Sequence, residues 1–498
     1  MMNNADEKIK KAFKLYNEKK FEESKIIFLN LIKNTEFDKR IHFMLYEIYF
    51  KLNDLKNAKK YLIDFIEHDN KNHIALNTLA NLYLKEGAIK HAEKNYLKAI
   101  NIKKDYLTAI TNLAVLYEGI GDKDNAEKYY LDGINLSPDD LSIYYNLSKI
   151  KPDFIDKKKI EHISQILKSE KLEPFNMAAG FFLLAEHSRK KKNIKEEIRN
   201  LELAHKYAFK DRINIKQQSR NHWLDVMPKN YNTLNFILQH EKNFLSYKET
   251  NKFENQFNQK FRDLEPIFII GLPRSGSTVV EAILSSGKKK ILNLGETNLI
   301  NWSVISTPKK NVSSLNGRLI GSKLEIALDN LGVFNLENNI FIEKSLENFF
   351  YIQIILKIFP KAKFINTCRN TKDNILAIFQ QFLSKISWSH SLEDILEYTN
   401  NYLKIIKFFK KKYPKQILSV KLEELTLNKE EVAKNIYEFC GLEWDKKALE
   451  FYKRKDLFTS TASNLQIRND IYSYDKNKYR PYYYLLKSFQ DKYEWLNQ

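Results

Sequence analysis

The feature that most constrains this chain is a 34-residue period in its first 150 residues. Small side chains return at one phase of the period, and large apolar side chains return at three others. The four columns are Ser24, Ala58, Ala92 and Ala126; Phe28, Leu62, Tyr96 and Tyr130; Ile32, Ile66, Ile100 and Ile134; and Leu45, Leu79, Leu113 and Leu147. Small residues let two helices of one repeat approach closely, and large ones stack on the next repeat. The period predicts an α-solenoid.

This pattern resembles the tetratricopeptide (TPR) repeat, with about four units over residues 7–150. Gly87 and Gly121 keep the same spacing at positions where the chain must turn. The resemblance implies a concave groove that binds a peptide or a partner helix. The alternative is that the array only packs against its own C-terminal domain. Residues 151–262 still have a helical pattern, and we expect degenerate helical repeats and a connector there.

The period changes at Pro266, where short β-rich runs begin to alternate with amphipathic segments. Alternation of this kind indicates an α/β domain, over residues 263–498, whose parallel sheet is flanked by helices. Ligands of such sheets bind at the carboxyl ends of the strands. Strands are expected at 266–271, 339–344, 362–368 and 415–421, and helices near 277–286, 346–360, 372–385, 391–412 and 428–441.

The first strand leads into the segment Gly271-Leu-Pro-Arg-Ser-Gly-Ser-Thr278 and then a helix. Glycines let the backbone wrap an anion, and a helix N-terminus offers N–H groups and a positive dipole. The spacing is that of a P-loop, but Ser277 stands where nucleotide triphosphatases have lysine. Arg274 places a cation inside the loop instead. The predicted anion-binding residues are Arg274, Ser275, Gly276, Ser277 and Thr278.

This loop resembles the 5′-phosphosulfate loop of sulfotransferases that use 3′-phosphoadenosine-5′-phosphosulfate (PAPS). The resemblance extends to bacterial proteins that fuse TPR repeats to a domain related to tyrosylprotein sulfotransferases. It covers nearly the whole chain, and its catalytic part spans about 266–485. It implies PAPS as cosubstrate and a reaction that needs no metal, because protein cations replace Mg²⁺.

Arg369 follows the strand at 362–368 and matches the arginine of the family's 3′-phosphate site. Arginine forms a bidentate fork on phosphate. In the family a serine eight residues later also grips this phosphate, but here that position is Ala377. One lost neutral hydrogen bond costs about 1 kcal/mol. We therefore expect a weakened site, unless another group substitutes for the serine.

The resemblance assigns Glu296, in a Gly-Glu segment, as the general base. Other sulfotransferases use a histidine between the two nucleotide motifs, yet none lies between Gly271 and Arg369. In the whole catalytic half only His390 is present. A carboxylate is then the natural candidate for the base.

Three further positions are carried over from the same family. Lys344, before Asn348-Phe349, matches the lysine that contacts the bridging or sulfuryl oxygens, although Glu343 and Leu346 depart from the pattern. The segment at 461–468 is similar to the family's T-x-S-x-x-Q-V-R segment. It implies that Ser463 approaches the transferred group and that Arg468 approaches the nucleotide.

The expected reaction is a direct in-line transfer of the sulfuryl group from PAPS to an acceptor hydroxyl. The resemblance favours a protein or peptide tyrosine, and a glycan, lipid or small-molecule hydroxyl stays open. Two readings from other classes compete with a sulfotransferase. A P-loop kinase or triphosphatase would depend on Mg-ATP, and a non-catalytic TPR adaptor with a decayed transferase domain would bind nucleotide without transferring sulfate.

The net charge of +20 does not by itself indicate nucleic-acid binding. Lysine supplies nearly all of it, because only 12 residues are arginine, and the lysines are scattered beside acidic residues. No zinc-finger spacing or RNP motif is present. With two cysteines, a polar start and no apolar run near the ~18 residues of a membrane span, the sequence predicts a cytoplasmic protein without a membrane segment.

Overall fold

The computed structural model describes residues 2–34, 38–169, 171–229, 259–305, 317–337, 339–454, 467–471 and 473–497. These residues form two compact units. The first comprises Met1–Tyr117, Asp124–Leu136 and Lys323–Asn335, and the second comprises Glu118–Lys123, Ser137–Ser322 and Leu336–Gln498. Each unit is described by itself.

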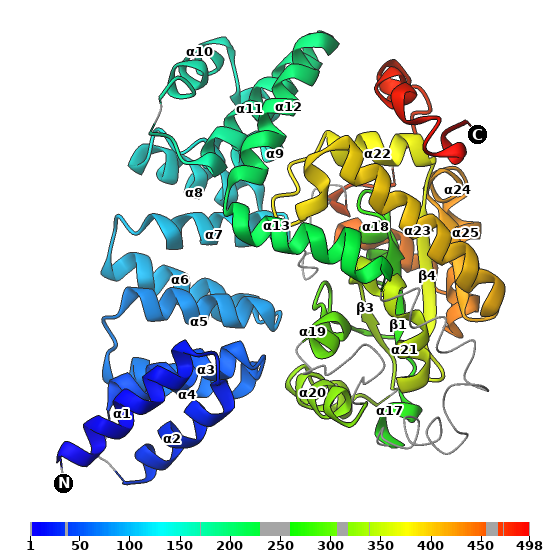
Figure 1. Ribbon diagram of the computed structural model, residues 1–498. Coiled ribbons are helices and arrows are strands. Elements are labelled where there is room, and N and C mark those ends of the chain that lie inside the picture. Colours follow the sequence, from blue (N-terminus) through cyan, green and yellow to red (C-terminus); the bar gives the residue numbers. More distant parts are fainter. Residues whose placement is uncertain are drawn as a thin grey trace. The chain divides into compact units, whose positions relative to one another are not determined.

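The first unit is built mainly from helices that pack in consecutive pairs, as the period predicts. Figure 1 shows the first of them, in blue and cyan, stacked along the array. The helices of the repeat region are α1 Met2–Asn17, α2 Phe21–Asn34, α3 Lys39–Lys51, α4 Leu55–His68, α5 His73–Lys85, α6 Ile89–Ile102, α7 Leu107–Ile120 and α8 Lys123–Leu136.

Three columns of the period are buried, and the column that begins with Ile32 is partly exposed. Every member of the small-residue column is 0% exposed, and so is every member of the column that begins with Phe28. The turn inside each repeat also follows the 34-residue step. Its left-handed residues are Lys19 (φ 61°), Asn53 (φ 57°), Gly87 (φ 71°) and Gly121 (φ 81°). The two glycines noted in the sequence are thus half of a column that a lysine and an asparagine complete.

The second unit begins with further helices. Lys192, with φ of 58°, makes the turn between α11 and α12, and these two helices pack along each other. The segments are α9 Leu141–Ile150, η1 Pro152–Phe154, α10 Lys157–Ile166, α11 Pro174–Lys190, α12 Ile194–Lys210, α13 Ile213–Asn221 and the π-helix η2 His222–Val226.

A parallel sheet forms the centre of the second unit, and this confirms the predicted α/β class. Among the described residues its five strands have the order β2-β3-β1-β4-β5. All five residues of β1 are buried. The sequence analysis did not predict β2, because a strand of 2 residues is too short to show a periodic pattern. The strands are β1 Ile267–Gly271, β2 Leu292–Asn293, β3 Phe341–Glu343, β4 Lys363–Cys368 and β5 Ile417–Lys421.

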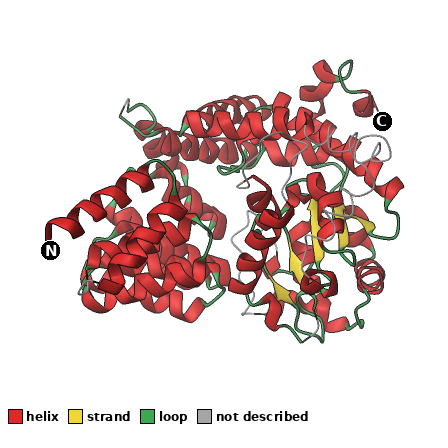
Figure 2. Ribbon diagram, turned by 60° about the horizontal axis from the view of Figure 1, so that its bottom comes forward, coloured by secondary structure: helices red, strands yellow, loops and turns green. Residues whose placement is uncertain are grey.

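Helices lie on both faces of this sheet (Figure 2). The α-helices of this unit are α17 Gln259–Asp263, α18 Ser277–Leu284, α19 Leu299–Ile305, α21 Ile352–Ile358, α22 Thr371–Phe379, α23 Leu392–Lys412, α24 Leu422–Leu427 and α25 Lys429–Cys440. Its 3₁₀ segments are η4 Leu346–Tyr351, η5 Ser387–His390, η6 Lys446–Lys453, η8 Arg480–Phe489 and η9 Glu494–Asn497. Helix α20 Gly317–Asn330 belongs to the first unit from Lys323 on, and so does the 3₁₀ segment η3 Val333–Asn335.

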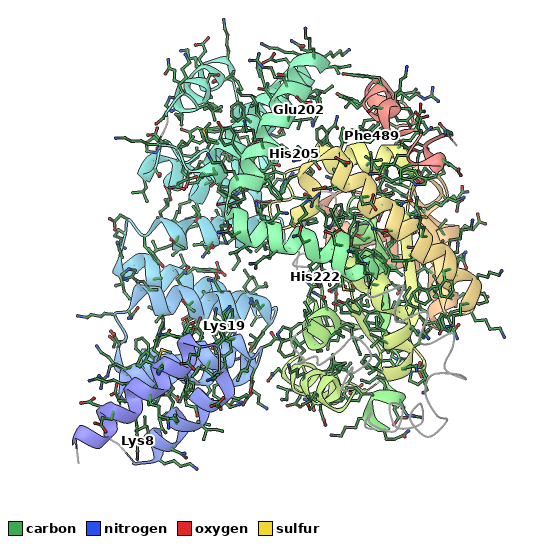
Figure 3. All side chains as sticks on the ribbon, in the orientation of Figure 1. Lys8, Lys19, Glu202, His205, His222 and Phe489 are labelled. Atoms are coloured by element: carbon green, nitrogen blue, oxygen red, sulfur yellow. The ribbon has the colours of Figure 1, made fainter. Side chains whose placement is uncertain are left out.

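Helix α12 is tied to the C-terminal end of α22 by buried polar contacts. Glu197 is 0% exposed and accepts hydrogen bonds from Arg189 Nε at 2.7 Å, Gln380 Nε2 at 3.2 Å and Tyr482 Oη at 2.6 Å. The same helix carries His205, which Figure 3 labels. The Nε2 atom of His205 lies 2.7 Å from the Phe379 carbonyl oxygen. These contacts fix the end of α22, a helix whose other end follows Arg369.

The small-residue column predicts a specific stability defect. Ala92→Leu adds three carbons at a fully buried position, so we expect a loss of about 1–3 kcal/mol in the free energy of unfolding. Urea unfolding measures this loss. The control is Lys98→Leu, which introduces a leucine at an exposed position of the same helix, α6. Equal stabilities of the two variants would contradict the packing of the column.

Candidate active site

The loop between β1 and α18 has the backbone shape of an anion cradle. Gly271 has φ of 143°, and a Cβ there would lie 2.4 Å from the Thr367 carbonyl oxygen. Gly276, with φ of 95°, is the N-cap of α18, and as a glycine it has no side chain to make a capping hydrogen bond. A glycine N-cap of this kind is a feature of helix ends that bind anions.

Within this loop the side chains have different roles. Ser275 Oγ donates to the Leu272 carbonyl oxygen at 2.7 Å and lies 2.8 Å from Thr367 Oγ1, so this hydroxyl fastens the loop to β4. Ser277 and Thr278 are buried at the start of α18. Arg274 has φ of 67°, a strained value for a residue with a Cβ. Such strain is common at functional sites.

Arg369 lies beside the loop, directly after β4. Its Nη1 donates to the Arg274 carbonyl oxygen at 3.2 Å. Its guanidinium lies 5.1 Å from the ring centre of Tyr474 and 5.3 Å from that of Tyr479. Its buried Nε has no hydrogen-bond partner among the residues that the structure describes. A buried N–H without a partner is costly, and a bound phosphate oxygen would satisfy it. Arg369 and the loop thus fit a doubly phosphorylated ligand.

Lys344, directly after β3, lies between two carboxylates. Its Nζ is 2.5 Å from Glu296 Oε1 and 3.5 Å from Glu281 Oε2. The lysine side chain is 1% exposed and that of Glu281 is 9% exposed, whereas that of Glu296 is 54% exposed. Burial lowers the pKa of Lys344, but the two carboxylates outweigh burial and hold this pKa above its usual value. Burial also raises the pKa of Glu281.

Glu343 fixes the local backbone around this ion cluster. Its buried carboxylate accepts from the Ser345 backbone N–H at 3.0 Å, from Thr297 Oγ1 at 2.9 Å and from Asn348 Nδ2 at 2.5 Å. The Lys344 backbone N–H donates to the Gly295 carbonyl oxygen at 2.8 Å. The segment that carries Glu296 is therefore held against the end of β3.

Two predicted site residues remain, Ser463 and Arg468. Ser463 falls in 455–466, outside the described residues. Arg468 Nη1 donates to the Arg454 carbonyl oxygen at 3.2 Å, and Arg454 Nη1 donates to Ser286 Oγ at 3.3 Å. Ser286 follows the C-terminal end of α18, so the structure does not bring Arg468 to the loop at the other end. The roles of Ser463 and Arg468 stay predictions.

Three residues of the site were missed by sequence reasoning. Glu281 is a charged residue within an apolar helix pattern, and that contrast could have revealed it. Glu347 is partly buried in η4, and burial raises its pKa to about 7, with Glu296 and Glu343 adding to the effect. Tyr474 gave no signal, because the chain has 28 tyrosines and nothing near residue 474 distinguishes this one.

Neither a metal centre nor a membrane helix is found in the described part of the chain. No group of three or more His, Cys, Asp or Glu side chains there could hold a metal ion. None of the described helices is long and apolar enough to cross a membrane.

Residues 266–446 match the model of the Sulfotransferase family. The chain contains a sulfotransferase domain. Residues 2–106 match the SusR N-terminal TPR domain, and residues 107–140 match the tetratricopeptide repeat, so TPR repeats precede the sulfotransferase domain in the chain. The predicted combination of TPR repeats and a sulfotransferase domain is confirmed.

Individual relatives cover parts of the chain. An uncharacterized protein of Aquifex aeolicus (strain VF5) is 32% identical over 234 residues, or 44% of this chain and 30% of that protein. The chain thus spans less than a third of this curated relative. The sulfotransferase domain from the Synechococcus PCC 7002 olefin synthase has a TM-score of 0.34 at 20% identity, covering 44% of this chain and 88% of that one. Pseudomonas aeruginosa PilF has a TM-score of 0.31 at 12% identity, and the match covers 40% of this chain and 88% of PilF.

The raised pKa of Glu347 predicts a pH-dependent stability. The folded protein binds this proton more tightly than the unfolded chain, whose carboxyl has a pKa near 4.5. The contribution of Glu347 to stability therefore falls as the pH rises from about 4.5 to about 7. We expect Glu347→Gln to raise the melting temperature at about pH 8 and to change it little at about pH 4.

Thermal unfolding across this pH range is the measurement. Glu438→Gln, at an exposed position of α25, is the control for loss of a carboxylate. A melting temperature of Glu347→Gln that follows the wild type at every pH would show that the buried carboxyl carries no such cost.

Proposed function

We propose that this protein transfers a sulfuryl group from PAPS to an acceptor hydroxyl by direct in-line displacement. The observation that carries the proposal is the position of Arg369. Its Nη1 donates to the Arg274 carbonyl oxygen of the P-loop-type segment, and its buried Nε has no hydrogen-bond partner among the described residues, which suits a ligand with separate 5′ and 3′ phosphate groups. The Lys344–Glu296 pair lies at the carboxyl end of the neighbouring strand β3.

The donor would be held by residues on both sides of β1. The loop from Gly271 to Thr278 would bind the 5′-phosphosulfate, and Arg369 would bind the 3′-phosphate. When bound, PAPS supplies the sulfuryl group. Lys344 and Arg274 supply the positive charge that stabilises developing charge on the oxygens, which dominates catalysis in transfers with loose transition states.

Glu296 is the proposed general base. Its side chain is half exposed, so an acceptor from solution can reach it, and Lys344 holds its carboxylate in place. As the acceptor oxygen attacks, Glu296 takes the hydroxyl proton. General-base catalysis of this kind contributes about 10²–10⁴-fold to the rate.

We propose a protein or peptide tyrosine as the acceptor, and the TPR repeats as the region that binds it or a partner. A phenol has a pKa near 10, so it needs only modest help from a base. The net charge of +20 favours an acidic peptide. The division into an array at 7–150, a helical connector at 151–262 and a catalytic domain at 263–498 belongs to this proposal.

Ligand-dependent melting tests the donor site. Adenosine 3′,5′-bisphosphate should stabilise the wild type, by ~2.7 kcal/mol at about 100 times Kd, and AMP should stabilise it less. Arg369→Ala should lose the difference between the two ligands. A response to Mg-ATP but not to the bisphosphate would contradict the proposal and favour a P-loop kinase.

A second experiment tests the base. We expect Glu296→Gln to lower kcat by about 10²–10⁴-fold while its affinity for adenosine 3′,5′-bisphosphate stays close to that of the wild type. The assay follows labelled sulfate from PAPS into a tyrosine-containing acidic peptide. The control is Glu443→Gln, at an exposed glutamate that pairs with Lys288. Unchanged turnover in Glu296→Gln would exclude Glu296 as the base.

A further inference from the structure

The 3′-phosphate side of the proposed donor site lacks one expected hydroxyl. Ala377 is 4% exposed on α22, where the resembling enzymes have a serine. Asp373 lies one helical turn earlier, and residues four apart share a face of a helix. A group that contacts Asp373 therefore lies along the face on which the serine would stand.

Tyr474 supplies a hydroxyl at this face. Its Oη donates to Asp373 Oδ2 and lies 3.4 Å from Arg369 Nη2. The same tyrosine ring covers the Arg369 guanidinium at 5.1 Å. A single side chain thus touches both the helix face that lost its serine and the arginine that would bind the phosphate.

The orientation of Arg369 leaves one edge for a ligand. Nη1 is used by the Arg274 carbonyl oxygen, and the aromatic rings of Tyr474 and Tyr479 lie near the guanidinium. Nε is buried and has no hydrogen-bond partner in the described part of the chain, and Nη2 has only the long contact with Tyr474. Nε and Nη2 together form the side edge of the fork, which can bind two phosphate oxygens.

Asp373 can release the Tyr474 hydroxyl without losing every donor. Tyr483 Oη donates to the other carboxylate oxygen, Oδ1, at 2.7 Å. If the Tyr474 O–H turns toward a phosphate oxygen, Asp373 keeps the hydrogen bond from Tyr483. No covalent bond changes in this step.

We propose that Tyr474 determines the preference for a 3′-phosphate. Its ring positions Arg369, and its hydroxyl donates to the phosphate in place of the serine that Ala377 replaces. The inference rests on the proposed function. It predicts that Tyr474 contributes to binding of ligands that carry a 3′-phosphate and not to binding of ligands that lack one.

Calorimetric titration with adenosine 3′,5′-bisphosphate and with AMP tests this inference without any turnover. We expect Tyr474→Phe to weaken bisphosphate binding about five- to tenfold and to leave AMP binding within about twofold of the wild type. Tyr484→Phe is the control, because it removes the hydroxyl of a tyrosine that is 50% exposed in the neighbouring segment η8. It should keep the wild-type ratio of the two affinities.

A second variant distinguishes the loss of the Tyr474 hydroxyl from a folding defect. Ala377→Ser in the Tyr474→Phe background should restore most of the lost bisphosphate affinity, and it should give a smaller gain in the wild type. An equal loss for both ligands, or the same loss in Tyr484→Phe, would overturn the role of Tyr474 while leaving the donor site intact. A wild type that binds AMP as tightly as the bisphosphate would overturn the proposed function and this inference together.

Discussion

Parallel pairing of β1 with β3 on one side and β4 on the other is the constraint on which the site depends. Ile267 pairs with Ile342 in β3 and with Lys363 in β4, so the carboxyl ends of the three strands meet at one edge (Figure 1). Each strand then delivers a different group there: a loop and helix end from β1, Lys344 from β3 and Arg369 from β4. Strand β1 itself carries no polar side chain and is wholly buried, whereas Glu343 of β3 and Thr367 of β4 fasten the segments beside it.

The second organising element is the buried ammonium of Lys344. An ion as buried as this one is stable only when it is paired, because desolvation of a lone charge costs several kcal/mol. Two carboxylates provide that pairing, and they differ in burial. Glu281 is enclosed on α18, while the side chain of Glu296 is half exposed. In the proposed reaction, Lys344 therefore keeps a buried counter-ion while Glu296 takes the proton of the acceptor.

Sequence periodicity predicted the parts of the fold that repeat or alternate. Three of the four 34-residue columns are buried as expected, and the predicted strands match four of the strands in the sheet. The sequence analysis placed the loop at 271–278, Lys344 and Arg369 at the ends of predicted strands, and the resemblance to sulfotransferases assigned Glu296. Tyr474 was not, because its contact with Arg369 joins positions 105 residues apart and no local pattern encodes that distance. Glu281 was missed for a related reason, since only the folded sheet brings Lys344 to it.

The central claim is that one edge of the sheet binds a nucleotide with separate 5′ and 3′ phosphates. A crystal structure of the complex with adenosine 3′,5′-bisphosphate tests this claim most directly. The account predicts the 5′-phosphate in the loop from Gly271 to Thr278 and the 3′-phosphate on Nε and Nη2 of Arg369. A bisphosphate bound elsewhere, or one whose 3′-phosphate does not contact Arg369, would contradict it.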